Sequence, residues 1–215
     1  NLVDTKACNT EIKETFVQLK YALERIQANV IQGGEVVRGL LKYSRPGDSG
    51  LEPLDLNIIL DRTLEMVQFK VKLSEIDIVR DYPDGLPKIK GNLTQLEEVF
   101  FNFIDNAYDS IVERREFLGE GGYRGKITIS AKPNRSYELV ITLEDNGMGI
   151  KTENNDKLFT PFFTTKASTR SGTGLGLYVI KKIITENHKG KISVESEHKV
   201  GTRFIIMLPL AKSIH

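Results

Sequence analysis

The sequence predicts an α/β fold, a two-layer sandwich with a mixed sheet and helices on one face, preceded by a long coiled-coil-type helix. Two observations support this prediction. Apolar residues near the N-terminus recur at alternating spacings of four and three, which is typical of supercoiled helices. Further along, segments of helical and strand periodicity follow in the order helix, strand, helix, two strands, loop, helix, two strands.

The N-terminal part of the chain, residues 1–47, is expected to be helical. The segment from Thr10 to Ser44 has no proline and predicts one helix about 50 Å long. Pro46 and Gly47 end that helix, so we predict a domain boundary between residues 47 and 48. Because an uncovered heptad seam exposes apolar surface, we expect self-association through it. The seam consists of Ile12, Phe16, Leu19, Leu23, Ile26, Val30, Val37 and Leu40.

The second part, residues 48–215, is predicted to form the sandwich. Its expected helices are 56–67 with Asp55 as N-cap, 94–117 and 175–187. Its expected strands are 76–82, 126–132, 137–144, 191–196 and 202–209. The segment from Lys151 to Ser171 has no sustained period and is expected to be a long loop.

Composition narrows the class of protein. With 40% hydrophobic residues, 27% charged residues and a net charge of +1, the chain is a globular type with no overall field that favours nucleic acid. The single Cys8 excludes an intramolecular disulfide. No apolar run approaches the roughly 20 residues that span a bilayer. A single cysteine favours a reducing, cytoplasmic setting. The chain starts at Asn1 rather than Met, so we expect a fragment whose parent carries any membrane anchor elsewhere.

Polar residues line one face of the predicted helix 94–117. Glu98, Asn102 and Asn106 are spaced four apart, and Asp105 and Asp109 lie close by. Amide and carboxylate oxygens suit Mg²⁺, which usually bridges to substrate phosphates. A solvated polar face on an amphipathic helix is the alternative interpretation.

Two glycine-rich turns carry the strongest functional signal. Asp145-Asn146-Gly147-Met148-Gly149-Ile150 follows a strand, where an Asp, expected to be ionised at pH 7, can accept the exocyclic amine of adenine. Gly172-Thr173-Gly174-Leu175-Gly176-Leu177 opens a helix, whose backbone N–H groups favour phosphate. Each turn alone is also compatible with an ordinary tight turn or a helix start.

The loop between these turns contains three phenylalanines within Phe159–Phe163, followed by Lys166 and Arg170. The phenylalanines suit a lid that closes on a ligand, or a small satellite apolar cluster. The two cations suit pairing with phosphate charge, or simple solvation.

Together these elements resemble the catalytic ATP-binding domain of sensor histidine kinases, in the GHKL superfamily. The match covers roughly residues 51–210. It rests on an N box, two glycine boxes and a phenylalanine box, at Asn102–Ala107, Asp145–Gly149, Gly172–Leu177 and Phe159–Phe163 respectively. Gly201-Thr202-Arg203-Phe204 also resembles the closing hairpin of that family.

The resemblance implies a Bergerat-type sandwich that holds ATP and Mg²⁺ under a flexible lid. By resemblance, Asn106 is the metal ligand, Asp145 reads adenine, and Lys166 faces the phosphates. Asn102, Glu98 and Lys166 are the expected catalytic residues. The expected cofactor-binding residues are Asn102, Asn106, Asp109, Asp145, Gly147, Gly149, Ile150, Phe159, Lys166, Gly172, Thr173, Gly174, Leu175, Gly176 and Leu177.

The N-terminal helix resembles the second helix of the dimerisation and phosphoacceptor domain of the same family. This implies a homodimer through that helix and a response regulator as partner. The phosphoacceptor histidine, expected on a preceding helix, has no counterpart here. His188, His198 and His215 are all expected to be surface residues.

The class of reaction follows from one position in the N box. Superfamily members that hydrolyse ATP carry a Glu one turn before the Mg²⁺-binding Asn, and here that position is Asn102. A neutral imidazole is already a nucleophile, so Asn102 favours transfer to histidine. The alternatives are a nucleotide-binding pseudokinase that signals by conformation, or a GHKL-type ATPase in which Glu98 assists.

Overall fold

The computed structural model describes residues 15, 18–23, 50–119, 121–165 and 174–211. Residues 15 and 18–23 belong to one compact unit, and the remaining described residues belong to a larger one. In the first unit, residues 18–23 are helical and expose Leu19, Tyr21 and Leu23. The other seam residues and the predicted boundary at 47/48 lie outside the described residues, so both stay predictions.

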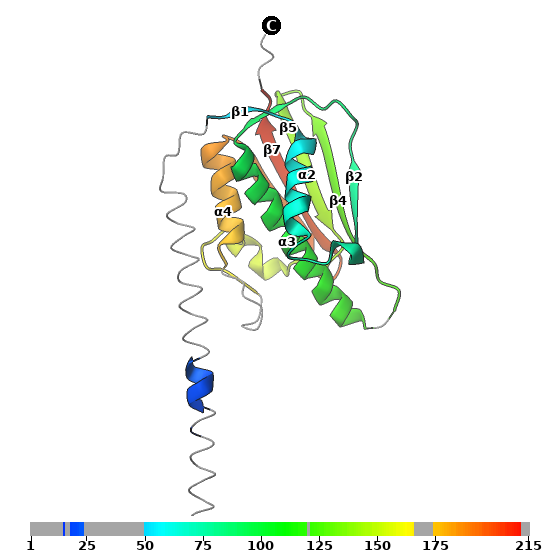
Figure 1. Cartoon of the computed structure of the whole chain (residues 1–215), viewed down its shortest axis with the longest axis vertical. Coiled ribbons are helices and arrows are strands. Elements are labelled where there is room, and N and C mark those ends of the chain that lie inside the picture. The colour runs from blue at the N-terminus through cyan, green and yellow to red at the C-terminus, as the bar shows by residue number, and fades with distance from the viewer. Residues whose placement is uncertain (1–14, 16–17, 24–49, 120, 166–173, 212–215) are drawn as a thin grey trace, which may run out of the picture. The chain divides into compact units, whose positions relative to one another are not determined.

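The larger unit is a two-layer α/β sandwich (Figure 1). Its five-stranded sheet has the order β2-β4-β5-β7-β6, and only β2 and β4 pair in parallel. The mixed sheet with helices on one face confirms the predicted fold class. These strands are β2 (Ile76–Asp81), β4 (Gly125–Pro133), β5 (Glu138–Asp145), β6 (Lys191–Glu197) and β7 (Gly201–Pro209).

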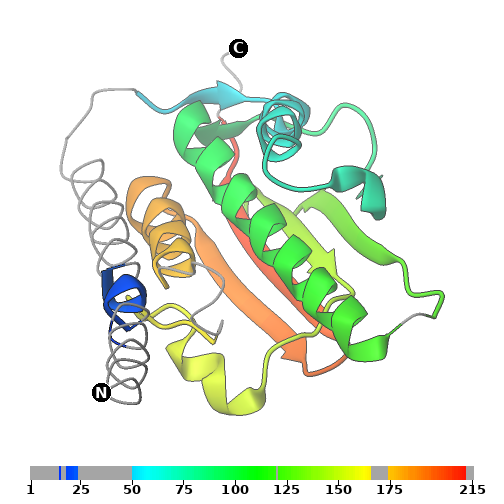
Figure 2. The ribbon, with the colours of Figure 1, turned by 60° about the horizontal axis from the view of Figure 1, so that its bottom comes forward.

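Helices α2 (Leu56–Val67), α3 (Leu93–Leu118) and α4 (Gly176–Lys182) form the second layer. Figure 2 shows α3 running diagonally across the sheet, with α4 beside it. The predicted N-cap of α2 is confirmed, because the Asp55 carboxylate accepts the Asn57 N–H at 2.8 Å. Asn92 caps α3 in the same way, accepting the Gln95 N–H at 3.0 Å.

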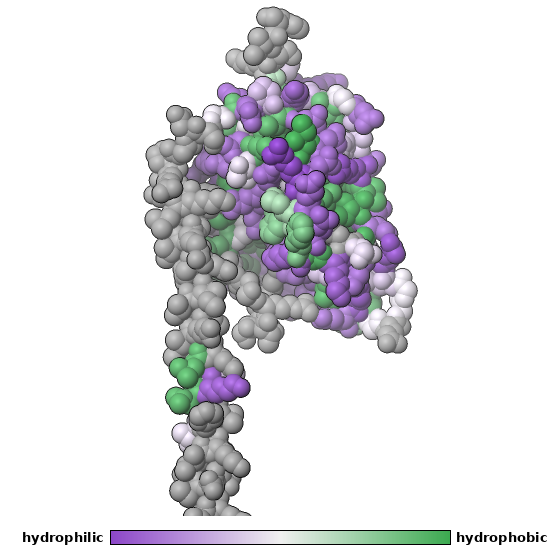
Figure 3. Space-filling view, in the orientation of Figure 1, coloured by the Kyte–Doolittle hydropathy of each residue, from purple (hydrophilic) through white to green (hydrophobic). Residues whose placement is uncertain are grey.

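The core lies between α3 and the sheet. The Phe103 and Phe204 rings lie 4.8 Å apart and join the two layers. The outer surface of the helix layer is mostly hydrophilic, with small apolar patches (Figure 3), as expected for amphipathic helices. The buried α3 residues are Leu96, Val99, Phe100, Phe103, Ile104 and Ile111, and they face Ile127, Ile129, Leu139, Ile141, Leu143, Ile206 and Leu208 of the sheet.

Several short elements were not predicted. β1 (Glu52–Leu54) pairs antiparallel with β3 (Ile89–Gly91), and a short 3₁₀ helix η1 (Leu73–Glu75) precedes β2. A longer 3₁₀ helix, η2 (Thr152–Lys157), lies inside the predicted loop. The helix that begins with α4 ends in a π turn, η3 (Ile183–Asn187). Elements of three to six residues are too short to show a hydrophobic period.

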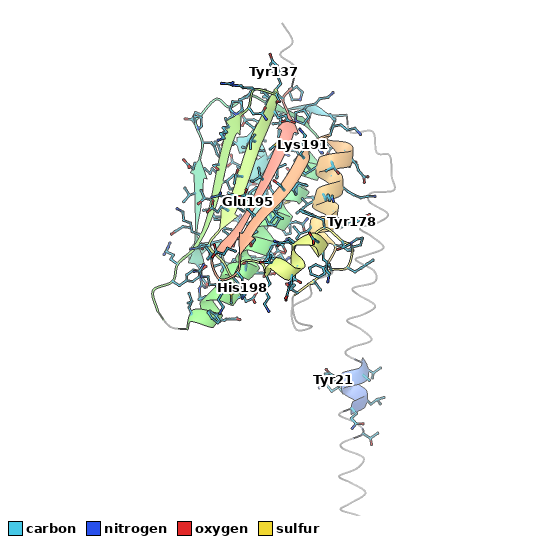
Figure 4. The ribbon with its side chains drawn as sticks, turned by 180° about the vertical axis from the view of Figure 1, so that it is seen from behind. Tyr21, Tyr137, Tyr178, Lys191, Glu195 and His198 are labelled. Atoms are coloured by element: carbon cyan, nitrogen blue, oxygen red, sulfur yellow. The ribbon has the colours of Figure 1, made fainter. Side chains whose placement is uncertain are left out.

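The prediction that His188 lies at the surface was wrong. The side chain is only 1% exposed. Its burial follows from the π turn, which places the residue between the end of the α4 segment and the start of α3. His198 is exposed, in the β6–β7 turn (Figure 4). His215 lies outside the described residues.

The other face of the sheet carries polar and charged side chains, among them Lys191 and Glu195 of β6 (Figure 4). Arg203 donates to Glu144 at 2.7 Å and to Glu195 at 3.4 Å across three adjacent strands. Such exposed pairs contribute at most about 1 kcal/mol each. Within the described part of the chain, no helix is long and apolar enough to cross a membrane.

Candidate nucleotide-binding site

Asn102 brings the N box against the second glycine box. It lies on α3, where its amide donates to the Glu98 carbonyl at 2.8 Å. Its Oδ1 lies only 3.2 Å from the position that a Cβ on Gly176 would occupy. The first residue of α4 therefore packs directly on the Asn face of α3, and a side chain at Gly176 would crowd that contact.

Asp145 ends β5 inside the sandwich and is 7% exposed. Its carboxylate accepts the Gly147 N–H at 2.8 Å, and the backbone of Thr202 and the side chain of Ser110 also hydrogen-bond to it. Burial nevertheless raises the pKa of Asp145 to about 7. The unliganded group is therefore about half ionised at pH 7, less than its usual carboxyl pKa would give. Desolvation outweighs the three hydrogen bonds.

The first glycine box packs against the protein on two sides. A Cβ at Gly147 would overlap Ser110 of α3, and one at Gly149 would overlap the Glu197 carbonyl at the end of β6. Gly149 also has φ of +67°, which side chains rarely adopt. The glycines therefore allow the turn to nest between α3 and the β6–β7 hairpin. Ile150 completes this contact, since its N–H donates to the Ser196 hydroxyl at 2.9 Å.

Sequence reasoning missed two residues that hold this turn in place, Arg114 of α3 and Tyr123 of the segment that follows α3. The Arg114 guanidinium donates to the carbonyls of Asn146, at 2.8 Å, and of Gly147, at 3.2 Å, and also to the Val200 carbonyl. The Tyr123 hydroxyl donates to the Asn146 carbonyl at 2.8 Å, and Arg114 lies over the Tyr123 ring at 5.4 Å. A lone Arg on a solvated helix face gives no sequence signal for such a role.

The Asn146 side chain, which belongs to the turn itself, also stabilises it by hydrogen bonds to neighbouring backbone. Its Oδ1 accepts the Lys126 N–H at 2.7 Å, and its amide donates to the Arg124 carbonyl at 3.0 Å. The side chain thus continues the β4–β5 pairing past the end of the strand. These bonds fix the position from which Asp145 faces the site.

The described residues Phe162 and Gly174, which precede and follow segment 166–173 in the sequence, lie in contact. The Phe162 backbone, at φ of +66°, lies so close to Gly174 that a Cβ there would come within 2.5 Å of the Phe162 carbonyl carbon. The Phe159 ring lies 5.4 Å from the Lys181 ammonium of α4. The phenylalanine box therefore packs on the second glycine box. Lys166, Gly172 and Thr173 lie outside the described residues, and their expected phosphate contacts stay predictions.

The predicted residues on α3 connect the two glycine boxes. Asn102 lies beside Gly176, and Ser110 lies beside Gly147 and Asp145. Asn106 and Asp109 lie between them, partly buried. Eight residues of helix span about 12 Å, which is the scale of a nucleoside triphosphate. The same face thus reaches a candidate base site at one end and a candidate phosphate site at the other.

Metal binding here would depend on a ligand as well as on the protein. Within the described ranges, no group of three or more His, Cys, Asp or Glu side chains has the spacing of a metal cage. The amide of Asn106 is suited to Mg²⁺ that takes its remaining ligands from phosphates and water. The residues present therefore fit a metal that arrives with a nucleotide.

A larger hollow of about 550 Å³ lies on the open face of the sheet, away from α3. Its charged lining includes Arg203, which pairs with both Glu144 and Glu195. A smaller cavity of about 10 Å³ lies beside Asp145, between Phe103 and Phe204. Both adjoin the first glycine box, since the larger hollow is also lined by Asp145 and Asn146. The smaller cavity holds about one water.

Comparison with known proteins agrees with this geometry. Residues 91–212 match the family model described as histidine kinase-, DNA gyrase B-, and HSP90-like ATPase. The chain is 35% identical over 176 residues to the signal transduction histidine-protein kinase AtoS of Escherichia coli K12, covering 82% of this chain and 27% of AtoS. It thus spans about a quarter of the length of that relative.

Solved structures show the same fold. The catalytic domain of histidine kinase ThkA superposes with a TM-score of 0.60 at 28% identity, covering 74% of this chain and 95% of that domain. ThkA in complex with the response regulator protein TrrA superposes with a TM-score of 0.65 at 23% identity, covering 87% and 50%.

The family match includes the N box, the first glycine box, the phenylalanine box and the closing hairpin, on the fold that such domains adopt. The resemblance drawn from the sequence is therefore confirmed. This chain belongs to the histidine kinase-, DNA gyrase B-, and HSP90-like ATPase family and carries the catalytic ATP-binding domain of a sensor histidine kinase.

Proposed function

We propose that this chain binds Mg-ATP along α3 and transfers the γ-phosphoryl group to a histidine on a helix outside the chain. The observation that carries the proposal is the contact between Asn102 and Gly176. In this proposal Asn102 is an amide, which cannot act as a general base, at the phosphate end, where hydrolytic relatives are expected to hold a Glu; its contact with the second glycine box supports that position. Phosphoryl transfer relies mainly on positioning and charge neutralisation.

Each end of the site has a distinct role in this proposal. Ionised Asp145 accepts the exocyclic amine of adenine, and the fixed turn from Gly147 to Gly149 orients that carboxylate. Asn106 ligates Mg²⁺, which neutralises charge on the β- and γ-phosphates. Lys166 and the second glycine box contact the phosphates, and the segment 166–173 acts as a lid.

The partners belong to the same proposal. The exposed Leu19, Tyr21 and Leu23 of the N-terminal helix suit a homodimer formed through the heptad seam. A response regulator Asp is the downstream phosphoryl acceptor, a proposal supported by the complex that ThkA forms with TrrA. Both steps suit a cytoplasmic domain, with any membrane anchor in regions outside this chain.

A transfer assay tests the reaction. The chain is mixed with a separately produced acceptor-helix fragment and γ-labelled ATP, and phosphohistidine is measured as acid-labile, base-stable label. We expect label on the fragment and none on the chain alone. Tight ATP binding with no label on any acceptor would favour the pseudokinase alternative.

A turnover assay separates the kinase from an ATPase. We expect slow phosphate release by the chain alone, changed less than about threefold by Glu98→Ala, since general-base catalysis contributes about 100-fold or more where it operates. The partly buried Glu98 side chain lies one turn before Asn102. Fast turnover that Glu98→Ala abolishes would instead favour a GHKL-type ATPase.

A further inference from the structure

His188 is a buried histidine that the proposed reaction does not use. Its Nε2 accepts the backbone N–H of Asn92 at 3.0 Å, and its Nδ1 lies 2.9 Å from the Ile183 carbonyl oxygen. A carbonyl only accepts, so Nδ1 carries the proton and Nε2 is the free acceptor. Only the neutral ring with this tautomer satisfies both bonds.

These bonds join two elements of the candidate site. Asn92 is the N-cap of α3, and His188 directly follows the π turn η3. A second bond, from the Asn187 amide to the Gln95 side chain at 3.1 Å, connects the same two segments. A Cβ at Gly91 would come 3.3 Å from the His188 ring, so the backbone before α3 packs directly on the imidazole. π turns are frequent at functional sites.

The other end of the α4 segment meets the same helix. Gly176 lies against Asn102, ten residues along α3 from Asn92. The helical segment from Gly176 to Asn187 therefore runs antiparallel to α3 and contacts it near both ends, about 15 Å apart. Because a helix moves as a stiff element, its anchor at His188 also sets the position of Gly176.

We propose that His188 is a positioning residue for the nucleotide's phosphates: by binding the N-cap of α3, it holds the start of α4 against the N box. This inference rests on the proposed function. It predicts that His188 affects the triphosphate end of a ligand much more than the base end. Asp145 and its turn are held by Arg114, Tyr123 and Asn146 instead.

The anchor also gives a pH signature. Burial lowers the pKa of His188. The charged side chains on the adjoining segments are exposed; they are Lys90, Glu186 and Lys189. No charged group among the described residues contributes to the lowering of the His188 pKa. Because its folded pKa is lowered, the stability that neutral His188 contributes is complete above the unfolded pKa near 6.5 and is lost as the pH falls from there through the folded pKa.

Two variants of the full chain test the inference. His188→Phe fills the space without an acceptor, and His188→Gln offers an uncharged acceptor to the Asn92 N–H. Dissociation constants for Mg-ATP, by calorimetry, and for adenosine, by NMR titration, are compared at pH 7.5. We expect His188→Phe to weaken Mg-ATP at least tenfold and adenosine less than twofold, and His188→Gln to stay within about threefold of wild type for both.

The pH series adds an independent readout. Asp145 titrates in both proteins, so the difference in melting temperature between wild type and His188→Gln isolates His188. We expect wild type to lose stability relative to His188→Gln as the pH falls below 6.5, because the folded pKa of His188 is lowered. A difference that does not change with pH would show that the ring is not held neutral between α3 and η3 and would overturn the inference, even if His188→Phe failed to fold. So would equal losses of Mg-ATP and adenosine in a folded His188→Phe. Wild type that binds no Mg-ATP would overturn the proposed function itself.

Discussion

The two ends of the candidate site are built differently. At the base end, the turn after Asp145 is held by the Arg114 side chain of α3 and by the Lys126 backbone of β4, and both glycines are packed against neighbouring backbone. At the phosphate end, α4 meets α3 through Gly176 and through the His188 anchor, and Phe162 is 61% exposed. The base end is fixed before a ligand arrives, whereas the phosphate end depends on a few contacts of one short helix.

The comparison also concerns charge. The base end buries a carboxyl group whose pKa is about 7, and the unliganded fold is therefore stabilised by a proton that the proposed contact with adenine would displace. Local stability is reduced at a site that is arranged for a ligand. The following predictions test the two ends separately, in order of decreasing effect.

Replacing the carboxylate tests the base end most directly. We expect Asp145→Asn to weaken Mg-ATP and adenosine alike by about a hundredfold, since a hydrogen bond to a charged acceptor contributes roughly 1.5–3 kcal/mol. Calorimetry and NMR titration measure both ligands. Loss of Mg-ATP affinity with adenosine unchanged would assign Asp145 to the phosphate end and contradict the comparison.

The same substitution is expected to stabilise the unliganded chain at alkaline pH. Because the folded pKa of Asp145 is raised from 3.8 to about 7, its contribution is complete below 3.8 and is lost as the pH rises through 7. A rise of about 3 in the pKa corresponds to at most roughly 4 kcal/mol of folding free energy. Asp145→Asn should therefore raise the melting temperature at pH 8 relative to wild type, with a smaller gain at pH 5 and little gain below pH 3.8.

Adenosine affinity should follow the ionisation of Asp145. If only the carboxylate accepts the adenine amine, a pKa of about 7 predicts binding about tenfold tighter at pH 8 than at pH 6. Adenosine has no phosphate to titrate, which isolates this group. Asp145→Asn provides the control and should give a flat profile, and a flat wild-type profile would contradict the assignment.

Crowding the phosphate end should weaken the binding of Mg-ATP alone, whereas a change at the base end weakens both ligands. A Cβ at Gly176 would lie 3.2 Å from Asn102 Oδ1, so Gly176→Ala pushes the two helices apart by a few tenths of an ångström. We expect Mg-ATP to bind about five- to tenfold more weakly and adenosine to be unchanged within twofold. Gly121, whose Cβ would meet open space, is the matched control. Equal losses for both ligands would remove the distinction between the ends.

Removing the brace behind the base end should have the smallest effect. Arg114→Ala removes donors to the Asn146, Gly147 and Val200 carbonyls but leaves the Tyr123 and Asn146 bonds in place. We expect about threefold weaker adenosine binding, near 0.7 kcal/mol. Arg115→Ala is the control, because Arg115 is the next residue of α3 but pairs with Glu75 of η1 at 2.7 Å. This variant should leave adenosine binding unchanged.

The sequence predicted most of the fold because long elements have clear periods. Helices α2 and α3 and strands β4 and β5 appear within a few residues of their predicted limits, since each buries one regular face. The three-residue strands β1 and β3 exist only because they pair with each other. No sequence pattern predicts the π turn, because it is held by the hydrogen bond from the distant Asn92 N–H to His188.

For the site, the sequence alone determined the boxes, their order and the Asn in place of a catalytic Glu, because these depend on residue type and spacing. Only the tertiary structure decided the environment of those residues. It made Asp145 a group with a pKa near 7, because burial by distant segments outweighs its local hydrogen bonds. It also decided that Arg114 holds the base end and His188 the phosphate end. The sequence does not indicate either role, because their hydrogen-bond partners lie 32 and 96 residues away in the chain.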